Sequence, residues 1–301
     1  MFFLLSNGLT LYLAIFLALA VGPAVALVRY VYNLDALERE PAGLLLALFW
    51  RGVIAALVAS VLEQVGMEAF GLLSGLGRQD PWFLLLSDLA VVGVIEEACK
   101  YVLMARATWH YPNFDCRYDG VVYAVATSLG FAAAENVTYG LAYGPGVLLG
   151  RAMMAIPAHM GFAVVFGFLY GEAKLLSVRG HRIGAGLCVA CGYLLSVLLH
   201  GLYDSTATLF GNGDATFLLA VAVIYLIVFP VVHTMARHDR RFLYRATAWR
   251  ATCRRFSPVR RPPRSLPPRA PPRSAARGGC RARRPRSKGA EKSWICRFSK
   301  T

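Results

Sequence analysis

The sequence contains few charged side chains. Only 16% of its 301 residues are Asp, Glu, Lys or Arg, whereas 57% are hydrophobic. A soluble domain carries about 25% charged residues, so this composition excludes an ordinary soluble protein. Long apolar runs with few charges are typical of membrane-spanning helices. We therefore expect the chain to lie in a membrane.

The seven cysteines lack the spacings of a disulfide framework or a structural zinc site. Cys188 and Cys191 form a CxxC pair, but the pair lies inside an apolar run. Free cysteines pack there as small hydrophobic side chains. Cys253, Cys280 and Cys296 lie in a basic C-terminal segment, which suits a reducing cytoplasmic location.

The N-terminus lacks the positively charged segment that normally opens a cleaved signal peptide, so we expect its apolar run to remain as a first span. A helix needs roughly 20 apolar residues to cross ~30 Å of hydrocarbon. Seven stretches are long enough, which predicts an all-α, polytopic membrane bundle of about seven helices. The predicted spans are residues 9–28, 42–62, 82–104, 121–141, 147–169, 183–206 and 217–232.

Lysine and arginine are concentrated in alternate connections between the predicted spans. The basic segments are 29–39, 106–117, 174–182 and 237–245, whereas 143–146 and 210–216 contain no Lys or Arg. Short positively charged loops remain on the cytoplasmic side of a membrane. We therefore expect a multi-pass protein of the cell (inner) membrane, with its N-terminus outside and its C-terminus in the cytoplasm.

Residues 246–301 differ in composition from the rest of the chain. They hold 17 of the 32 Lys and Arg residues, eight of the fifteen prolines and one acid, Glu291. A segment with so little apolar surface cannot build a core. We therefore divide the chain into a helical bundle at 1–245 and a disordered Arg/Pro-rich cytoplasmic tail at 246–301. The tail either binds anionic lipid head groups or has no role of its own, and we expect no specific nucleic-acid partner.

Ionisable side chains occur inside several predicted spans, where a charge is costly and usually functional. Glu96 and Glu97 precede Lys100 by four and three residues, so all three can share one helix face. Lys100 can neutralise one carboxylate, and the other could act as a general base. A structural ion cluster is the alternative, but two adjacent carboxylates beside one lysine favour chemistry.

Three further predicted spans also carry polar side chains. Glu135 and Asn136 lie in the fourth span, His159 lies in the fifth, and His200 and Asp204 lie one turn apart in the sixth. A single histidine in a helix is usually a packed core residue. Here two histidines on separate spans accompany three glutamates and an aspartate. We therefore expect these side chains to converge in one site.

These motifs together resemble the PrsW family of intramembrane proteases, which belongs to the superfamily of the CAAX prenyl endopeptidases. The matching strings are Glu96-Glu97-x-x-Lys100, Phe131-x-x-x-Glu135-Asn136, His159 before a glycine-rich stretch, and His200-x-x-x-Asp204. The resemblance covers about residues 20–235. The third motif departs from the family pattern, because the fourth residue after His159 is Ala163 rather than glycine.

The resemblance implies proteolysis of single-pass membrane proteins, typically anti-sigma factors. The residues that it assigns to catalysis are Glu96, Glu97, Lys100, Glu135, Asn136, His159, His200 and Asp204. It implies that Glu96 or Glu97 activates water and that His200 with Asp204 faces the tetrahedral intermediate. Relatives carry asparagine where this chain has Asp204, and an aspartate donates to an oxyanion only when it is protonated.

Two chemistries fit these residues. Either a glutamate takes a proton from water, or His159, His200 and a carboxylate bind zinc, which activates its bound water. The sequence lacks HExxH, the usual zinc-binding pair of one helix, and this absence favours the metal-free chemistry.

Two other classes of membrane protein remain as alternatives. A proton-coupled transporter also uses intramembrane Glu, His and Lys, although the sequence shows no inverted repeat. The other is a non-catalytic scaffold that binds a partner helix through small-residue faces. For the protease, we expect the lipid bilayer and a single-pass membrane substrate as partners.

Overall fold

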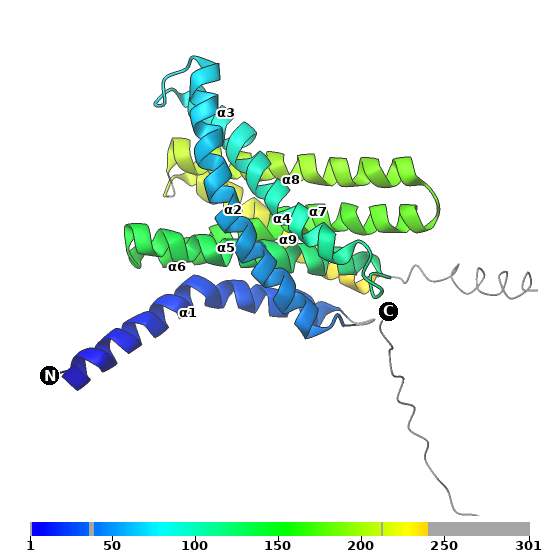
Figure 1. Cartoon of the computed structure of the whole chain (residues 1–301), viewed down its shortest axis with the longest axis horizontal. Helices are drawn as coiled ribbons and strands as arrows, with labels where there is room; N and C mark the ends of the chain where they lie inside the picture. The colour runs from blue at the N-terminus through cyan, green and yellow to red at the C-terminus, as the bar shows by residue number, and fades with distance from the viewer. Residues whose placement is uncertain (1, 36–38, 212, 240–301) are drawn as a thin grey trace, which may run out of the picture. The chain divides into compact units, whose positions relative to one another are not determined.

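The computed structural model describes residues 2–35, 39–211 and 213–239, which belong to the unit Met1–Cys253. The tail predicted at 246–301 lies outside the described residues. All regular structure in the described part is helical (Figure 1), which confirms the all-α prediction. The elements are α1 (Phe2–Leu34), α2 (Ala42–Ser74), α3 (Pro81–Ser87), η1 (Asp88–Gly93), α4 (Val94–Thr108), α5 (Arg117–Tyr143), α6 (Gly146–Met153), α7 (Ala155–Val178), α8 (Arg182–Phe210) and α9 (Ala215–Arg237).

Six of the seven predicted spans are long and apolar enough to cross a membrane. They are Gly8–Leu34, Ala42–Ser74, Arg117–Tyr143, Gly146–Val178, Arg182–Phe210 and Ala215–Arg237. The protein is therefore a multi-pass membrane protein, as predicted. The remaining span, 82–104, falls on α3, η1 and α4. Its charged residues lower its hydropathy. The π-helical segment η1 also divides it, and such segments frequently occur at functional sites.

Two further predicted spans differ from the observed helices. α2 ends at Ser74 rather than at 62, so Glu63 lies on a helix instead of in an outer loop. The helix continues through Gly66 and Gly71 and ends where Gly75 takes a left-handed φ of 65°. The predicted span 147–169 is divided at Met154 into α6 and α7.

α5 lies at the centre of the described helices and packs against α1, α2, α4, α6 and α7. Glycine allows α2 and α5 to approach closely. A Cβ at Gly130 of α5 would overlap the carbonyl of Phe49, and one at Gly52 of α2 would overlap the carbonyl of Thr127. Small residues of α5 and α2 thus allow the two backbones to pack closely.

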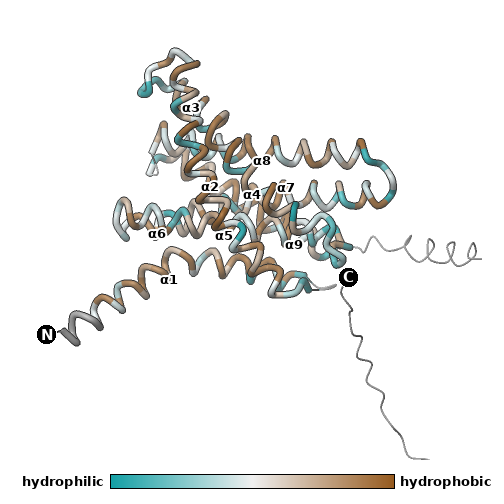
Figure 2. Tube along the Cα trace, in the orientation of Figure 1, coloured by the Kyte–Doolittle hydropathy of each residue, from teal (hydrophilic) through white to brown (hydrophobic). Residues whose placement is uncertain are grey.

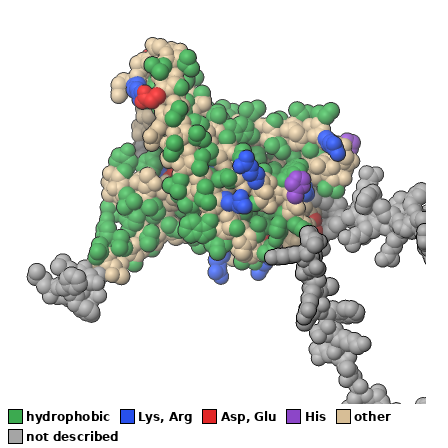
Figure 3. Space-filling model, viewed as in Figure 1, with side chains coloured by type: hydrophobic (Ala, Val, Ile, Leu, Met, Phe, Trp, Pro, Cys, Tyr) green, Lys and Arg blue, Asp and Glu red, His purple; other side chains and the backbone are tan. Residues whose placement is uncertain are grey.

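The outer surface of these helices is apolar. Brown, hydrophobic segments run along α1, α2 and α8 in Figure 2, and the face shown in Figure 3 is largely covered by hydrophobic side chains. Large side chains such as Leu57, Leu187 and Leu226 are exposed. Exposed apolar side chains over whole helices suit a lipid environment rather than water.

The four basic connecting segments begin at one end of the helices. The Tyr118 hydroxyl donates to the Val31 carbonyl over 3.1 Å, and Lys174 Nζ donates to the Trp109 carbonyl over 2.5 Å. The backbone N–H of Tyr118 donates to Asp239 over 3.2 Å. The ends of α1, α4, α7 and α9 therefore lie near the start of α5, as the alternating topology predicts.

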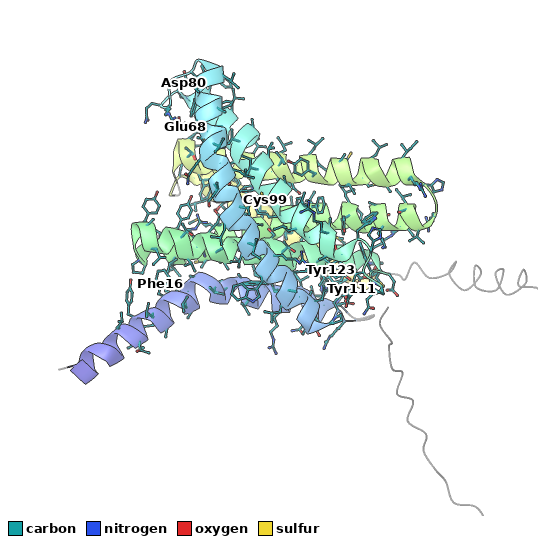
Figure 4. The ribbon with its side chains drawn as sticks, in the orientation of Figure 1. Phe16, Glu68, Asp80, Cys99, Tyr111 and Tyr123 are labelled. Carbon is teal, nitrogen blue, oxygen red and sulfur yellow. The ribbon has the colours of Figure 1, made fainter. Side chains whose placement is uncertain are left out.

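The α2–α3 turn lies at the opposite end. Figure 4 shows Glu68 and Asp80 at the end where α2 and α3 meet, and Tyr111 and Tyr123 toward the other end, with Cys99 between them. Figure 1 shows the α7–α8 turn and the α8–α9 turn at opposite ends of α8. The polar groups in the middle of the spans lie between these two ends.

Candidate active site

The first part of the site is one face of α4. Lys100 Nζ lies 3.0 Å from Glu96 Oε2 and 2.8 Å from Glu97 Oε1. These contacts follow from the helical spacing of four and three residues. Glu96 is 5% exposed, and Glu97 and Lys100 are fully buried. One ammonium group is therefore shared by two carboxylates.

His200 of α8 completes this cluster. Its Nδ1 lies 2.8 Å from Glu97 Oε1, and its Nε2 lies 3.2 Å from Asp204 Oδ2 and 3.6 Å from Glu96 Oε2. An ionised Glu97 can only accept, so we assign the Nδ1 proton to His200. Nε2 then faces the carboxylates of Glu96 and Asp204, and a proton or another cation must lie between these acceptors.

Close backbone approach brings α8 to η1 and so positions His200. A Cβ at Gly201 would lie 2.7 Å from the Cα of Leu89, and one at Gly93 would lie 3.0 Å from the carbonyl of Val197. A larger residue at Gly201 would therefore force α8 away from η1. This approach depends on two small residues on separate helices.

His159 of α7 joins the cluster from the other side. Its Nε2 lies 2.7 Å from Glu135 Oε2 of α5, and its Nδ1 lies 3.3 Å from Lys100 Nζ. The ring centroids of His159 and His200 are 5.1 Å apart. The ring of Phe131, one turn before Glu135, lies 4.0 Å from Lys100 Nζ. His159 therefore lies within the cluster despite the loose spacing of its motif.

A cavity of about 1260 Å³ opens beside this cluster. Five of the eight predicted site residues line it: Glu96, Glu135, His159, His200 and Asp204. The other three, Glu97, Lys100 and Asn136, are buried and are not among its lining residues. The structure thus divides the predicted residues into a group that faces the cavity and a group that supports it.

Asn136 contacts groups outside the two-histidine cluster. Its Nδ2 donates to the carbonyl of Ala20 in α1 over 3.4 Å, and its Oδ1 accepts from Arg151 Nε over 2.8 Å. Arg151 Nη2 lies 3.5 Å from Glu135 Oε2. Asn136 is thus linked to the site through Arg151.

Three charged residues that line the cavity were not among the predicted site residues. They are Glu63, Asp88 and Arg151. Asp88 and Arg151 fall inside predicted spans, so the high cost of an intramembrane charge could have identified them. Glu63 lies one residue beyond the predicted end of the second span, which concealed it.

The cavity offers a group of metal-ligating atoms. One ligand atom each from Glu96, His159 and His200 lies within 4.8 Å of the others. Two imidazoles and one carboxylate form a donor set that suits zinc. The carboxylate of Glu97 holds Nδ1 of His200, and such a partner orients the metal-binding nitrogen of a histidine. These residues therefore fit a metal ion.

A second group of potential ligands, Asp115, Cys116 and Asp119, serves a structural purpose. Asp119 Oδ2 accepts the backbone N–H groups of Asp115 and Cys116 and so caps α5. Burial and the neighbouring carboxylates raise the pKa of the Cys116 thiol. A protonated thiol is a poor metal ligand, so the cap alone accounts for this group.

Comparison with known proteins gives a consistent result. Residues 40–234 match the family described as PrsW family intramembrane metalloprotease. The chain is similar to Protease PrsW of Geobacillus kaustophilus, with 33% identity over 184 residues that cover 61% of this chain and 76% of the relative. It is 28% identical to Protease PrsW of Bacillus subtilis over 192 residues, which cover 64% of this chain and 82% of the relative.

A third relative extends the match further along the chain. Protease PrsW of Clostridioides difficile is 28% identical over 224 residues, which cover 71% of this chain and 84% of the relative. No solved structure matches the chain. The family resemblance predicted from the motifs is confirmed: this chain belongs to the PrsW family of intramembrane metalloproteases, and it is a peptidase.

Proposed function

We propose that this protease hydrolyses a peptide bond of a single-pass membrane protein, of the anti-sigma-factor kind, in the cavity beside Glu96, His159 and His200. The observation that carries this proposal is that buried or half-buried acids and histidines from α4, α5, α7 and α8 meet at one cavity inside an apolar bundle. A hydrolase needs such groups to activate water, and the bilayer itself supplies none.

The cavity also has an apolar rim that a membrane-embedded substrate could cross. Leu17 of α1 and Trp50 and Leu57 of α2 line the cavity and are 52%, 58% and 63% exposed. We name these three side chains the α1–α2 mouth. α1 packs on α5 and α6, whereas α2 packs on α4 and α5. The mouth joins the outer apolar surface to the polar groups of the cavity.

The absence of HExxH favoured metal-free chemistry, whereas the family description and the convergent ligand atoms favour the metal-assisted version. Glu96, His159 and His200 would hold the ion, which would lower the pKa of bound water. Glu97 orients His200 over 2.8 Å, and Glu135 holds His159 over 2.7 Å. Acceptance of the water proton would then fall to Glu135 or Asp204, the cavity carboxylates that contact the two histidines. Without a metal, Glu96 accepts it.

Cleavage of a defined substrate tests this function. The purified protein, reconstituted in lipid vesicles with added zinc, should cut a single-span reporter protein into two fragments. Glu96→Gln and His200→Ala should each abolish the cut while inserting normally into the membrane. Glu68→Gln is the matched control, because it makes the same change at an exposed glutamate that does not line the cavity. An intact reporter with the wild-type protein, or cleavage by Glu96→Gln at the wild-type rate, would overturn the proposal.

A further inference from the structure

Arg151 is a charged residue within the membrane-spanning segment Gly146–Val178. Its side chain is only 18% exposed, and a charge at such a place is costly unless other groups pair with it. Arg151 lies in the last turn of α6, directly before the break at Met154 that separates α6 from α7. The break allows Arg151 and His159 to reach α5 from two separate helices.

Three residues of α5 hold the guanidinium. Nε donates to Asn136 Oδ1 over 2.8 Å, Nη2 lies 3.5 Å from Glu135 Oε2, and the group lies 3.8 Å from the ring centroid of Tyr139. Glu135 and Tyr139 are one helical turn apart and share a face. Two donor edges and a stacking plane are properties of arginine that lysine lacks.

The oxygen of Glu135 that faces Arg151 is also the one that contacts His159. Glu135 Oε2 lies 2.7 Å from His159 Nε2 and 3.5 Å from Arg151 Nη2. Asn136 in turn is anchored on the Ala20 carbonyl of α1. A continuous chain of contacts therefore runs from α1 through Asn136, Arg151 and Glu135 to His159.

We propose that Arg151 is a positioning residue of the active site, which fixes the Glu135 carboxylate so that this carboxylate holds His159. Asn136 acts through Arg151 rather than on the substrate, because it does not line the cavity and its side-chain oxygen accepts from the guanidinium. This inference rests on the proposed function for its kinetic readout, but its structural readout is independent of cleavage.

Kinetics of single and double variants provide the first test. Arg151→Lys and Asn136→Ala should each lower kcat roughly 10–100-fold, the usual cost of losing a group that orients a ligand, with little change in KM. Arg151→Ala combined with Asn136→Ala should be no slower than Arg151→Ala alone. Added guanidinium should restore part of the Arg151→Ala rate. A raised KM with unchanged kcat, or additive losses, would overturn the proposal in favour of direct substrate contact.

Arg51→Ala is the matched control. Arg51 also lies within a membrane-spanning helix, α2, where its Nη1 donates to the Leu103 carbonyl over 3.4 Å, and it is not a cavity-lining residue. Its loss should leave kcat near the wild-type value. An equal fall of kcat in Arg51→Ala would show that any intramembrane arginine matters to folding alone, and would overturn a specific role for Arg151.

Chemical modification of the histidines gives the readout that needs no cleavage. Diethyl pyrocarbonate should modify His159 severalfold faster in Arg151→Ala than in the wild-type protein, because Glu135 no longer holds Nε2. His200 should react at an unchanged rate and provides the internal reference. Unchanged His159 reactivity would overturn the proposal even if the protein cleaves its substrate. Faster His159 reactivity in a protein that cleaves nothing would instead place the failure in the proposed function.

Discussion

Nδ1 of His200 lies 2.8 Å from Oε1 of Glu97, the same oxygen that accepts from Lys100 Nζ. Two elements, α4 and α8, thus meet at one buried carboxylate oxygen. Glu97 is fully buried and is not a cavity-lining residue, whereas its neighbour Glu96 lines the cavity. Adjacent glutamates therefore have different surroundings, and we infer different tasks for them.

The two glutamates should differ when each is replaced by glutamine. Glu96→Gln should reduce kcat at least roughly 10²–10⁴-fold, the usual contribution of a group that transfers a proton, because it removes either a ligand of the metal ion or, without a metal, the acceptor of the water proton. Glu97→Gln should reduce it only roughly 10–100-fold, since it disturbs the orientation of His200. Reporter cleavage in vesicles measures both, with equal membrane insertion confirmed by protease protection. A Glu97→Gln variant that is slower than Glu96→Gln would contradict the assignment.

Replacing Lys100 should lower the stability of the folded protein more than replacing Glu96 or Glu97 does. It is fully buried and is the ammonium shared by Glu96 and Glu97. Lys100→Met should lower the free energy of unfolding by about 3–5 kcal/mol, because it removes the buried ammonium group that two buried carboxylates share. Thermal unfolding in detergent measures the loss.

The control for Lys100 is an exposed ion pair of similar length. Arg78 Nη2 lies 2.7 Å from Glu68 Oε2, and both side chains are more than half exposed. Arg78→Met should cost only about 0–1 kcal/mol. Equal losses for the two variants would show that burial does not govern the Lys100 contacts.

Local spacing explains which parts of the site could be predicted. Glu96, Glu97 and Lys100 contact one another within a single helix, so their sequence separation was sufficient to predict the cluster. The helical spans were predictable because apolar composition and length define them. α2 extends past its predicted end because Glu63 interrupts the apolar run without breaking the helix.

Contacts between helices explain what the sequence could not predict. Arg151 and Glu63 lie far apart in the sequence, on α6 and α2, and only the packing of the helices places them at one cavity. Asn136 could be identified from its motif, but its partner Arg151 lies on another helix. The pairing of His159 with Glu135 likewise depends on how α7 packs against α5.

Removal of metal should separate the two proposed chemistries. After exhaustive chelation, cleavage should stop and should return when zinc is added. Zinc content measured on the purified protein should fall in His159→Ala and in His200→Ala, because each removes one of the converging ligand atoms. His181→Ala, at an exposed histidine before α8, should retain its metal. Full activity in a protein measured to be free of metal would leave only the glutamate chemistry.

The two ends of the helices should face opposite sides of the membrane. Gly180 lies in the turn between α7 and α8, and Gly144 lies in the turn between α5 and α6. The basic flanks of Gly180 predict a cytoplasmic position for that turn. A reporter that is active only in the cytoplasm should therefore work at Gly180 and fail at Gly144. Activity at both sites would contradict the predicted crossing of the membrane between them.

The α1–α2 mouth should contact the substrate before cleavage. Photo-reactive amino acids at Trp50 and Leu57 should cross-link a single-span reporter in the Glu96→Gln background, because these side chains are exposed and also line the cavity. Leu46 and Val61 provide matched controls on the same helix. They are 60% and 61% exposed, close to the 58% and 63% of Trp50 and Leu57, but they do not line the cavity.

Cross-links from Trp50 and Leu57 that an excess of unlabelled reporter removes would identify this route. Equal cross-links from Leu46 and Val61 would show only that the reporter meets α2 in the bilayer. Cross-links from the controls alone would place the approach elsewhere. Because exposure is nearly the same at all four positions, a difference between the pairs would reflect their contact with the cavity rather than their access to lipid.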